Sequence, residues 1–176
     1  MQRRLDGPAL PRLRRSVRLR IEFDAPGQFR GVDEADTICN DEAVAAGLPG
    51  VYKAWLADQT AASAPASSFF QATGPYVMPD GTQVADDWAD LTDGSLDNFI
   101  TVTADGGSAE GEVWTNVLSD GTQKGAAAAD SCDGWTNIGA GTQLGRVGVT
   151  NVGDSGWTDS GTFTCEAPIL LYCFGQ

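Results

Sequence analysis

The chain has 176 residues, of which 41% are hydrophobic, and it carries a formal net charge of −13. This length suits a single domain of ordinary size, and no apolar run reaches the roughly 20 residues that a membrane helix needs. A body this acidic repels polyanions, so the folded domain is not expected to bind nucleic acid.

Positive charge is concentrated at the start of the chain. Residues 1–20 hold seven arginines and one aspartate, a net charge of +6, whereas the other 156 residues hold four cations and 23 carboxylates, a net charge of −19. No apolar segment follows the arginines, so an intact signal peptide is not visible. Three interpretations of residues 1–15 stay open: a basic arm that contacts an acidic neighbour, a solvated tail, or a wrongly assigned start that hides the true export signal. Residues 16–176 form the expected domain.

The first elements are marked by their residue patterns. Strict alternation in VRLRIEF predicts a strand over residues 17–23. The next segment, DEADTICNDEAVAAGLPG, predicts a helix that Asp33 caps, that Gly47 closes in a left-handed conformation, and that Pro49 prevents from continuing. The apolar stripe of this helix places Cys39 toward the core.

The second half of the chain is dominated by turns. VYKAWLAD, residues 51–58, predicts a strand or short helix, and a loop follows at residues 60–68. Beyond residue 74, short apolar pieces alternate with Asp-Gly pairs at 80–81, 93–94, 105–106, 120–121 and 133–134. Because such pairs favour turns, this pattern predicts a β-rich region with long surface loops. The final run, PILLYCF, predicts a buried strand.

Four cysteines set the strongest constraint on the fold. The chain has no Cys-x-x-Cys and no histidine, so it lacks the usual residues of zinc sites and of redox-active dithiol sites. Disulfides or buried thiols remain, and the loop-rich composition favours an oxidising compartment. Three pairings are open. If PILLYCF is a central strand, Cys173 can reach Cys39 on the helix, and Cys132 then pairs with Cys165 inside that span.

Several segments together resemble a known family. They are the cysteine-bearing helix with AAGLPGVYKAWLAD, then GPYVMPDGTQVADDWADLTDGS, EVWT, SCDGWT and FTCEAPILLYCF. Over about residues 21–175 their order is similar to the endostatin-like branch of the C-type-lectin-like fold, which includes the endostatin domain of certain collagens and bacterial endostatin-like outer-membrane and secreted proteins. The resemblance implies one α+β domain with a mixed, mainly antiparallel sheet, one or two helices, long loops, and the nested disulfides Cys39–Cys173 and Cys132–Cys165.

The resemblance also implies a role in binding. We expect a non-enzymatic adhesion module, secreted, periplasmic or on an outer surface, that recognises a protein or carbohydrate ligand through loops between about residues 92 and 160. The zinc and heparan-sulfate binding of endostatin is not carried over, because histidine and arginine clusters are absent from the domain sequence. The alternative is a structural subunit of a surface assembly, homo- or hetero-oligomeric, that uses residues 1–15 to contact acidic neighbours.

Motifs for catalysis are weak in this sequence. GDSG at residues 153–156 imitates the nucleophile segment of serine proteases, but without histidine Ser155 has no ordinary base. The chain has 24 carboxylates, and nothing in their spacing selects an acid and base pair for a glycosidase. We therefore expect no enzyme.

The stretch DDWADLTDGSLDN is a candidate calcium site. Calcium takes about six to eight oxygen ligands, and the candidate ligands are Asp86, Asp87, Asp90 and Asp93. The spacing matches no EF-hand loop, and helix caps, turns and solvated faces explain the same residues. Calcium therefore remains a candidate cofactor rather than an established one.

Four residues are candidates for ligand binding. Asp93 and Asp97 lie in the acidic stretch, and Trp135 and Trp157 stand beside glycine in loop sequence. Of the five tryptophans these two are the better candidates for exposure and could stack on a sugar, but packing in the core is the favoured interpretation.

Overall fold

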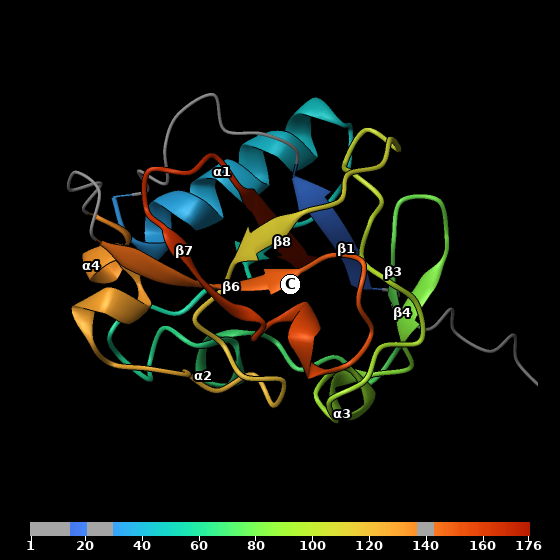
Figure 1. The fold of residues 1–176 in the computed structure, drawn as a ribbon. Helices are drawn as coiled ribbons and strands as arrows, with labels where there is room; N and C mark the ends of the chain where they lie inside the picture. The colour runs from blue at the N-terminus through green and yellow to red at the C-terminus, as the bar shows by residue number, and fades with distance from the viewer. Residues whose placement is uncertain (1–14, 21–29, 137–142) are drawn as a thin grey trace, which may run out of the picture.

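The computed structural model describes residues 15–20, 30–136 and 143–176 (Figure 1). Its elements in chain order are β1 (Arg15–Arg20), α1 (Val32–Ala45), β2 (Tyr52–Ala54), α2 (Pro65–Ser68), β3 (Tyr76–Val77), β4 (Gln83–Ala85), α3 (Trp88–Leu91), β5 (Glu112–Trp114), the 3-10 turn η1 (Ala128–Asp130), α4 (Cys132–Trp135), β6 (Leu144–Val149), the 3-10 turn η2 (Ser155–Trp157), β7 (Gly161–Thr164) and β8 (Leu170–Gly175). The expected basic arm lies outside the described residues, apart from Arg15, with which β1 begins.

All eight strands belong to one mixed sheet. Its order is β4-β3-β1-β8-β5-β6-β7, and β2 also pairs with β8. The β1–β3 and β5–β8 pairs are parallel, while the other pairs are antiparallel. Strand β8 has β1 along one edge and both β5 and β2 along the other, so the predicted last strand is central. The α+β class and the mixed, mainly antiparallel sheet are confirmed.

Helix α1 lies against the sheet in Figure 1 and is the one helix longer than a single turn in the described part of the chain. Its buried residues recur every four positions, at Ala35, Cys39 and Ala43, as the apolar stripe requires. The predicted cap is wrong: Gly31 is the N-cap and no side chain caps the helix, so Asp33 falls in the first turn. The predicted closing residue is confirmed, because Gly47 has a φ of 68°.

Polar side chains of α1 complete the pairing of β2. Asn40 Oδ1 accepts from the backbone N–H of Tyr52 at 2.8 Å, and Asn40 Nδ2 donates to the Tyr52 carbonyl at 2.8 Å. Asp36 Oδ1 accepts from the N–H of Ala54, also at 2.8 Å. These bonds satisfy β2 on the edge that faces away from β8, which fixes the helix relative to the sheet.

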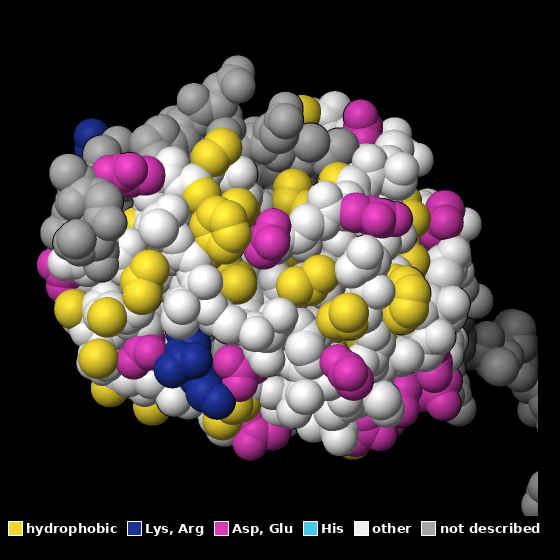
Figure 2. Space-filling view, in the orientation of Figure 1, with side chains coloured by type: hydrophobic (Ala, Val, Ile, Leu, Met, Phe, Trp, Pro, Cys, Tyr) yellow, Lys and Arg dark blue, Asp and Glu magenta, His cyan; other side chains and the backbone are white. Residues whose placement is uncertain are grey.

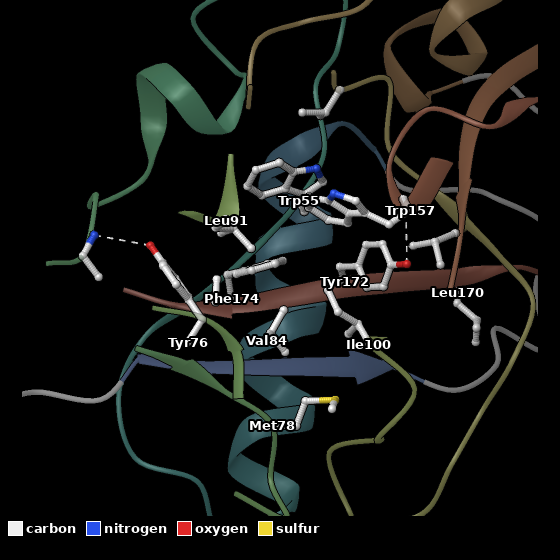
Figure 3. Close-up of a cluster of buried hydrophobic side chains, with 14 of the residues drawn as sticks. Trp55, Tyr76, Met78, Val84, Leu91, Ile100, Trp157, Leu170, Tyr172 and Phe174 are labelled. Carbon is white, nitrogen blue, oxygen red and sulfur yellow. Dashed lines mark hydrogen bonds between the residues drawn. The ribbon is translucent and has the colours of Figure 1, made fainter. Parts of the chain in front are cut away.

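The two faces of β8 divide the core. Leu170, Tyr172 and Phe174 join one buried cluster, and Leu171 and Cys173 join the other, as the alternation of a strand requires. Figure 3 shows the first cluster, in which Trp55 lies 4.9 Å from Trp157 and 5.2 Å from Phe174 between ring centroids. Tyr172 Oη donates to the Trp157 carbonyl at 3.2 Å, and burial raises the pKa of this phenol.

Two nested disulfides tie the fold together. Cys39 of α1 is bonded to Cys173 of β8, with Cα atoms 5.4 Å apart, and Cys132 is bonded to Cys165, with Cα atoms 5.7 Å apart. The predicted pairing is therefore confirmed, and the bonds are consistent with an oxidising compartment. Among the described residues, no helix is long and apolar enough to cross a bilayer.

Candidate ligand-binding surface

The loops of the domain carry an almost unbroken negative charge. Residues 54–123 contain eleven carboxylates and neither lysine nor arginine. Two nearby cations are already engaged, because Lys124 lies 2.7 Å from Asp159 and Arg146 lies 2.9 Å from Asp130. Figure 2 shows acidic side chains spread over this face, with basic ones confined to a small part of it. The field around the loops therefore attracts cations.

Asp-Gly pairs give these loops a repeated, rigid geometry. In four of them the aspartate carboxylate accepts from the backbone N–H two residues later, and three examples are Asp80 from Thr82 at 2.9 Å, Asp120 from Thr122 at 2.9 Å, and Asp105 from Gly107 at 3.1 Å. The glycines that follow these three have φ values of 89°, 80° and 87° respectively, which few other residues adopt readily. The predicted turns are therefore present.

Hydrogen bonding keeps one of these turn carboxylates ionised. The Thr103 hydroxyl and the Gly107 N–H donate to Asp105 and lower the pKa of its carboxyl. Because the bonds favour the charged form, this turn presents negative charge over a wider pH range than an isolated aspartate would.

The candidate calcium ligands have other uses in the structure. Asp87 caps α3 by accepting from the N–H of Asp90 at 3.1 Å, and Asp90 accepts from the N–H of Asp86 at 2.7 Å. Asp93 accepts from the N–H of Ser95 at 2.9 Å, which forms a turn. Within the part of the chain that is described, no three histidine, cysteine or acidic side chains are grouped to hold a metal ion. The arrangement favours the caps and turns over calcium.

The favoured interpretation of Trp135 and Trp157, packing in the core, is confirmed, and the competing one, a platform that stacks on sugar, is not supported. Both side chains are 0% exposed, so neither ring can stack on a ligand. Trp135 Nε1 donates to the Ala57 carbonyl at 2.9 Å, and Trp157 packs against Trp55. A glycine distant in the sequence permits the close packing: a Cβ at Gly145 of β6 would come within 3.1 Å of the Trp135 ring.

An aromatic side chain that sequence analysis missed is exposed on the same loops. Phe99 is 50% exposed, whereas its neighbour Ile100 is fully buried. The loop beneath it is held by two backbone bonds, from Leu96 N–H to the Gly153 carbonyl at 2.7 Å and from Asp97 N–H to the Val84 carbonyl at 3.0 Å. Phe99 therefore projects from an ordered loop. In the sequence it opens the short apolar piece FITV, in which nothing separates an exposed from a buried residue.

We define the Phe99 surface as residues 93–99 and 151–155, the two loops that the bond between Leu96 and Gly153 joins. The predicted ligand-binding residues Asp93 and Asp97 are exposed here, as is Asp154. Asp97 Oδ2 accepts from Gln83 Nε2 at 3.0 Å, which orients its carboxylate. Asp154, in the GDSG segment, accepts from the N–H of Gly156 at 2.9 Å and caps η2. The structure thus brings Asp93 and Asp97 onto one surface and places both tryptophans elsewhere.

The structure defines a class of protein: an α+β domain that is cross-linked by two disulfides and displays acidic, turn-rich loops. No protein-family model matches the sequence, and no curated protein is significantly similar to it. The chemistry of the Phe99 surface is therefore the basis for inferring the function of this protein.

Proposed function

We propose that this protein is a non-enzymatic binding module, active outside the cytoplasm, that attaches through the Phe99 surface to a positively charged protein. The observation that carries this proposal is Phe99, half exposed on a hydrogen-bonded loop inside a segment without any cation. Aromatic residues dominate the energetics of protein interfaces, and Phe99 supplies an aromatic side chain on an ordered, acidic loop.

The chemistry of the surface favours lysine or arginine on the partner. A cation can lie over the face of Phe99 while Asp93 or Asp97 neutralises its charge, and a cation–π contact contributes about 0.5–1 kcal/mol at an exposed site. Because the loop is already ordered, little conformational entropy is lost on binding. Sulfated glycans would be repelled by the same carboxylates, so a protein ligand is preferred over a polyanionic carbohydrate.

The endostatin-like architecture and the extracytoplasmic location belong to this proposal. They are supported by the nested disulfides, by the central position of the last strand, and by the packing of one long helix on the sheet. Secreted, periplasmic and outer-surface proteins all lie in oxidising environments, where disulfides persist.

The test uses immobilised decalysine peptide and immobilised heparin as probes for the oxidised protein. We expect the protein to bind decalysine, with affinity that falls as salt rises above about 0.1 M, and not to bind heparin. Phe99→Ala should weaken decalysine binding about twofold to fivefold, whereas Phe163→Ala, which removes a phenylalanine that is 37% exposed on β7, should not. Equal effects of the two substitutions, or binding to heparin alone, would contradict the proposal.

A second candidate function is assembly through the arginine-rich start of the chain. Strand β1 begins at Arg15, which pairs with Tyr76 of β3, so the first described residue of the arginine-rich segment lies beside the β3–β4 hairpin. Opposite charges on this segment and on the acidic domain favour contact between copies or with an acidic neighbour. Deletion of residues 1–14 should then lower the oligomeric state in sedimentation velocity, and an unchanged state would exclude this function.

A further inference from the structure

A hollow of about 320 Å³ opens at the start of α1, between β2 and the loop that precedes α2. Its lining includes Asp36 of α1, Lys53 of β2, and Asp58 and Phe69 on either side of α2. It shares no residue with the Phe99 surface. Its volume is at the lower end of the range for small-molecule sites, roughly 300–1,000 Å³, so it suits a compact ligand.

Two carboxylates in this hollow retain unused acceptors. Asp36 Oδ1 accepts from the N–H of Ala54, and Asp36 Oδ2 has no hydrogen-bond partner among the described residues. Asp58 Oδ1 accepts from the N–H and hydroxyl of Thr60 at 2.6 and 2.7 Å and from the Ser63 hydroxyl at 2.8 Å, while Asp58 Oδ2 likewise lacks a partner in the described chain. One oxygen of each carboxylate fixes the local fold, and the other is left to interact with a ligand.

Hydrogen-bond donors line the same hollow without pairing with these acids. Lys53 Nζ donates to the Ser68 carbonyl at 3.0 Å and forms no ion pair with any described residue. An ammonium group has three donors, so two stay available. The first turn of α1 adds backbone N–H groups and the positive end of the helix dipole, because Gly31 supplies no capping side chain.

We infer that this hollow binds a small zwitterion of the free α-amino acid class, with its ammonium group at Asp36 and Asp58 and its carboxylate toward Lys53 and the first turn of α1. Such a ligand places a positive charge beside the two acids and a negative charge beside the amine. A monosaccharide would leave the acids and Lys53 uncompensated in a partly desolvated space, which is unfavourable. The ring of Phe69 supplies an apolar surface for a side chain.

The experiment uses saturation-transfer NMR on the oxidised protein with a mixture of the standard L-amino acids. Parallel mixtures contain N-acetylated amino acids, alkyl amines and monosaccharides. We expect transfer to at least one free amino acid and weaker transfer to each analogue that lacks one charge. Absence of transfer to any amino acid at millimolar concentration, or equal transfer to the N-acetylated set or to the monosaccharides, would overturn the inference.

Substitutions assign the binding to the hollow. Asp36→Asn keeps an oxygen for the Ala54 N–H, and Lys53→Met keeps the length of the side chain, so both should fold, which thermal unfolding checks. Each should weaken amino-acid binding about tenfold or more, as expected when a charged hydrogen-bond partner is lost. Asp41→Asn, on the exposed side of α1, is the matched control and should bind normally. Unchanged binding in both hollow variants would overturn the inference.

Proton release on ligand binding distinguishes direct contact by Asp36 from a purely structural role of this residue. Burial raises the pKa of Asp36 to about 6, against the opposing effects of the Ala54 N–H and Lys53, while Asp33 raises it further. Asp58 and Arg30 are the other charged groups around the hollow. A ligand ammonium favours the ionised acid, so binding near pH 6 should release protons, measured by calorimetry in buffers of different ionisation enthalpy. Asp36→Asn should abolish this release, and its persistence there would contradict the inference.

Discussion

Two glycines of β6 have no room for a methyl group. A Cβ at Gly148 would lie 2.0 Å from the Trp157 carbonyl oxygen, and a Cβ at Gly145 would lie 2.7 Å from Cys132 Sγ. Neither glycine has a positive φ, so space and not backbone conformation requires glycine at these positions. Strand β6 can therefore approach the inner disulfide and the core tryptophans closely.

Gly148→Ala tests this close approach. Because the nearest atom belongs to the backbone, the methyl group can be accommodated only by moving β6 or the segment at Trp157. We expect the free energy of unfolding, measured by urea titration, to fall by roughly 2–3 kcal/mol. The control is Gly161→Ala on the neighbouring strand β7, where a Cβ would meet nothing within 4 Å. A similar loss in both variants would show that crowding is not the cause.

Asp36 makes stability depend on pH in the opposite sense to most aspartates. Its pKa is raised from 3.8 to about 6 in the folded state, chiefly by burial. A carboxyl of this kind stabilises the fold fully below the unfolded pKa, and this contribution is lost as pH rises through the folded value. At neutral pH the buried charge therefore lowers stability.

Asp36→Asn should raise the free energy of unfolding at pH 7. The shift corresponds to at most about 3 kcal/mol, and solvent screening of this partly exposed group reduces the expected gain to about 1 kcal/mol. Below pH 3.8 the gain should disappear, because Asp36 is then neutral in both states. Urea titrations of both proteins across this pH range provide the measurement. A variant that is less stable at pH 7 would contradict the assignment of burial as the cause.

At the scale of elements, the two disulfides close loops of very different length. The outer bond spans 134 residues and the inner bond spans 33. Both pairs are buried and both can be replaced by alanine, so the comparison is chemically matched. In the chain-entropy account, the longer loop restricts the unfolded chain more strongly.

Removal of each pair should therefore cost different amounts. We expect Cys39→Ala with Cys173→Ala to lower the free energy of unfolding by about 5 kcal/mol, and Cys132→Ala with Cys165→Ala by about 4 kcal/mol. Urea midpoints of the two double variants provide the comparison. A larger loss from the inner pair would mean that local geometry near α4 dominates over loop length.

The elements that sequence analysis located correctly are those with local signals. The helix has its apolar stripe and Gly47, the Asp-Gly pairs have their turn chemistry, and PILLYCF has a continuous apolar run. Geometry that depends on distant contacts was missed. The N-cap moved to Gly31, and α4 winds with positive φ at all four of its residues, which no propensity predicts. This left-handed turn buries Trp135.

The candidate sites show the same division. Asp93 and Asp97 lie in loop sequence and are exposed on the Phe99 surface, and their role in binding stays a prediction. Phe99 itself was not found, because an exposed and a buried phenylalanine look alike before a run such as ITV. The hollow at α1 depends on Asp36, Lys53 and Asp58, which no spacing connects and which only the packing of α1 against β2 assembles.

Across the whole molecule, charge repulsion opposes the compact state. The net charge is −13, and the few cations in the described domain that form ion pairs are gathered around Asp130 and Asp159. Added salt should screen this repulsion and stabilise the folded protein. We expect the melting temperature to rise by roughly 2–4 °C between about 10 mM and 500 mM NaCl. KCl should act equally, and a lower melting temperature in either salt would exclude net repulsion.

The central place of β8 has a consequence for biosynthesis. Three strands pair with a segment that the ribosome makes after all of them, and Cys39 has no partner until residue 173 has been translated. The earlier strands cannot complete their native pairing on a nascent chain, so the sheet closes only when synthesis of the domain is finished. The Cys39–Cys173 disulfide can therefore form only after β8 has been made and has joined the sheet.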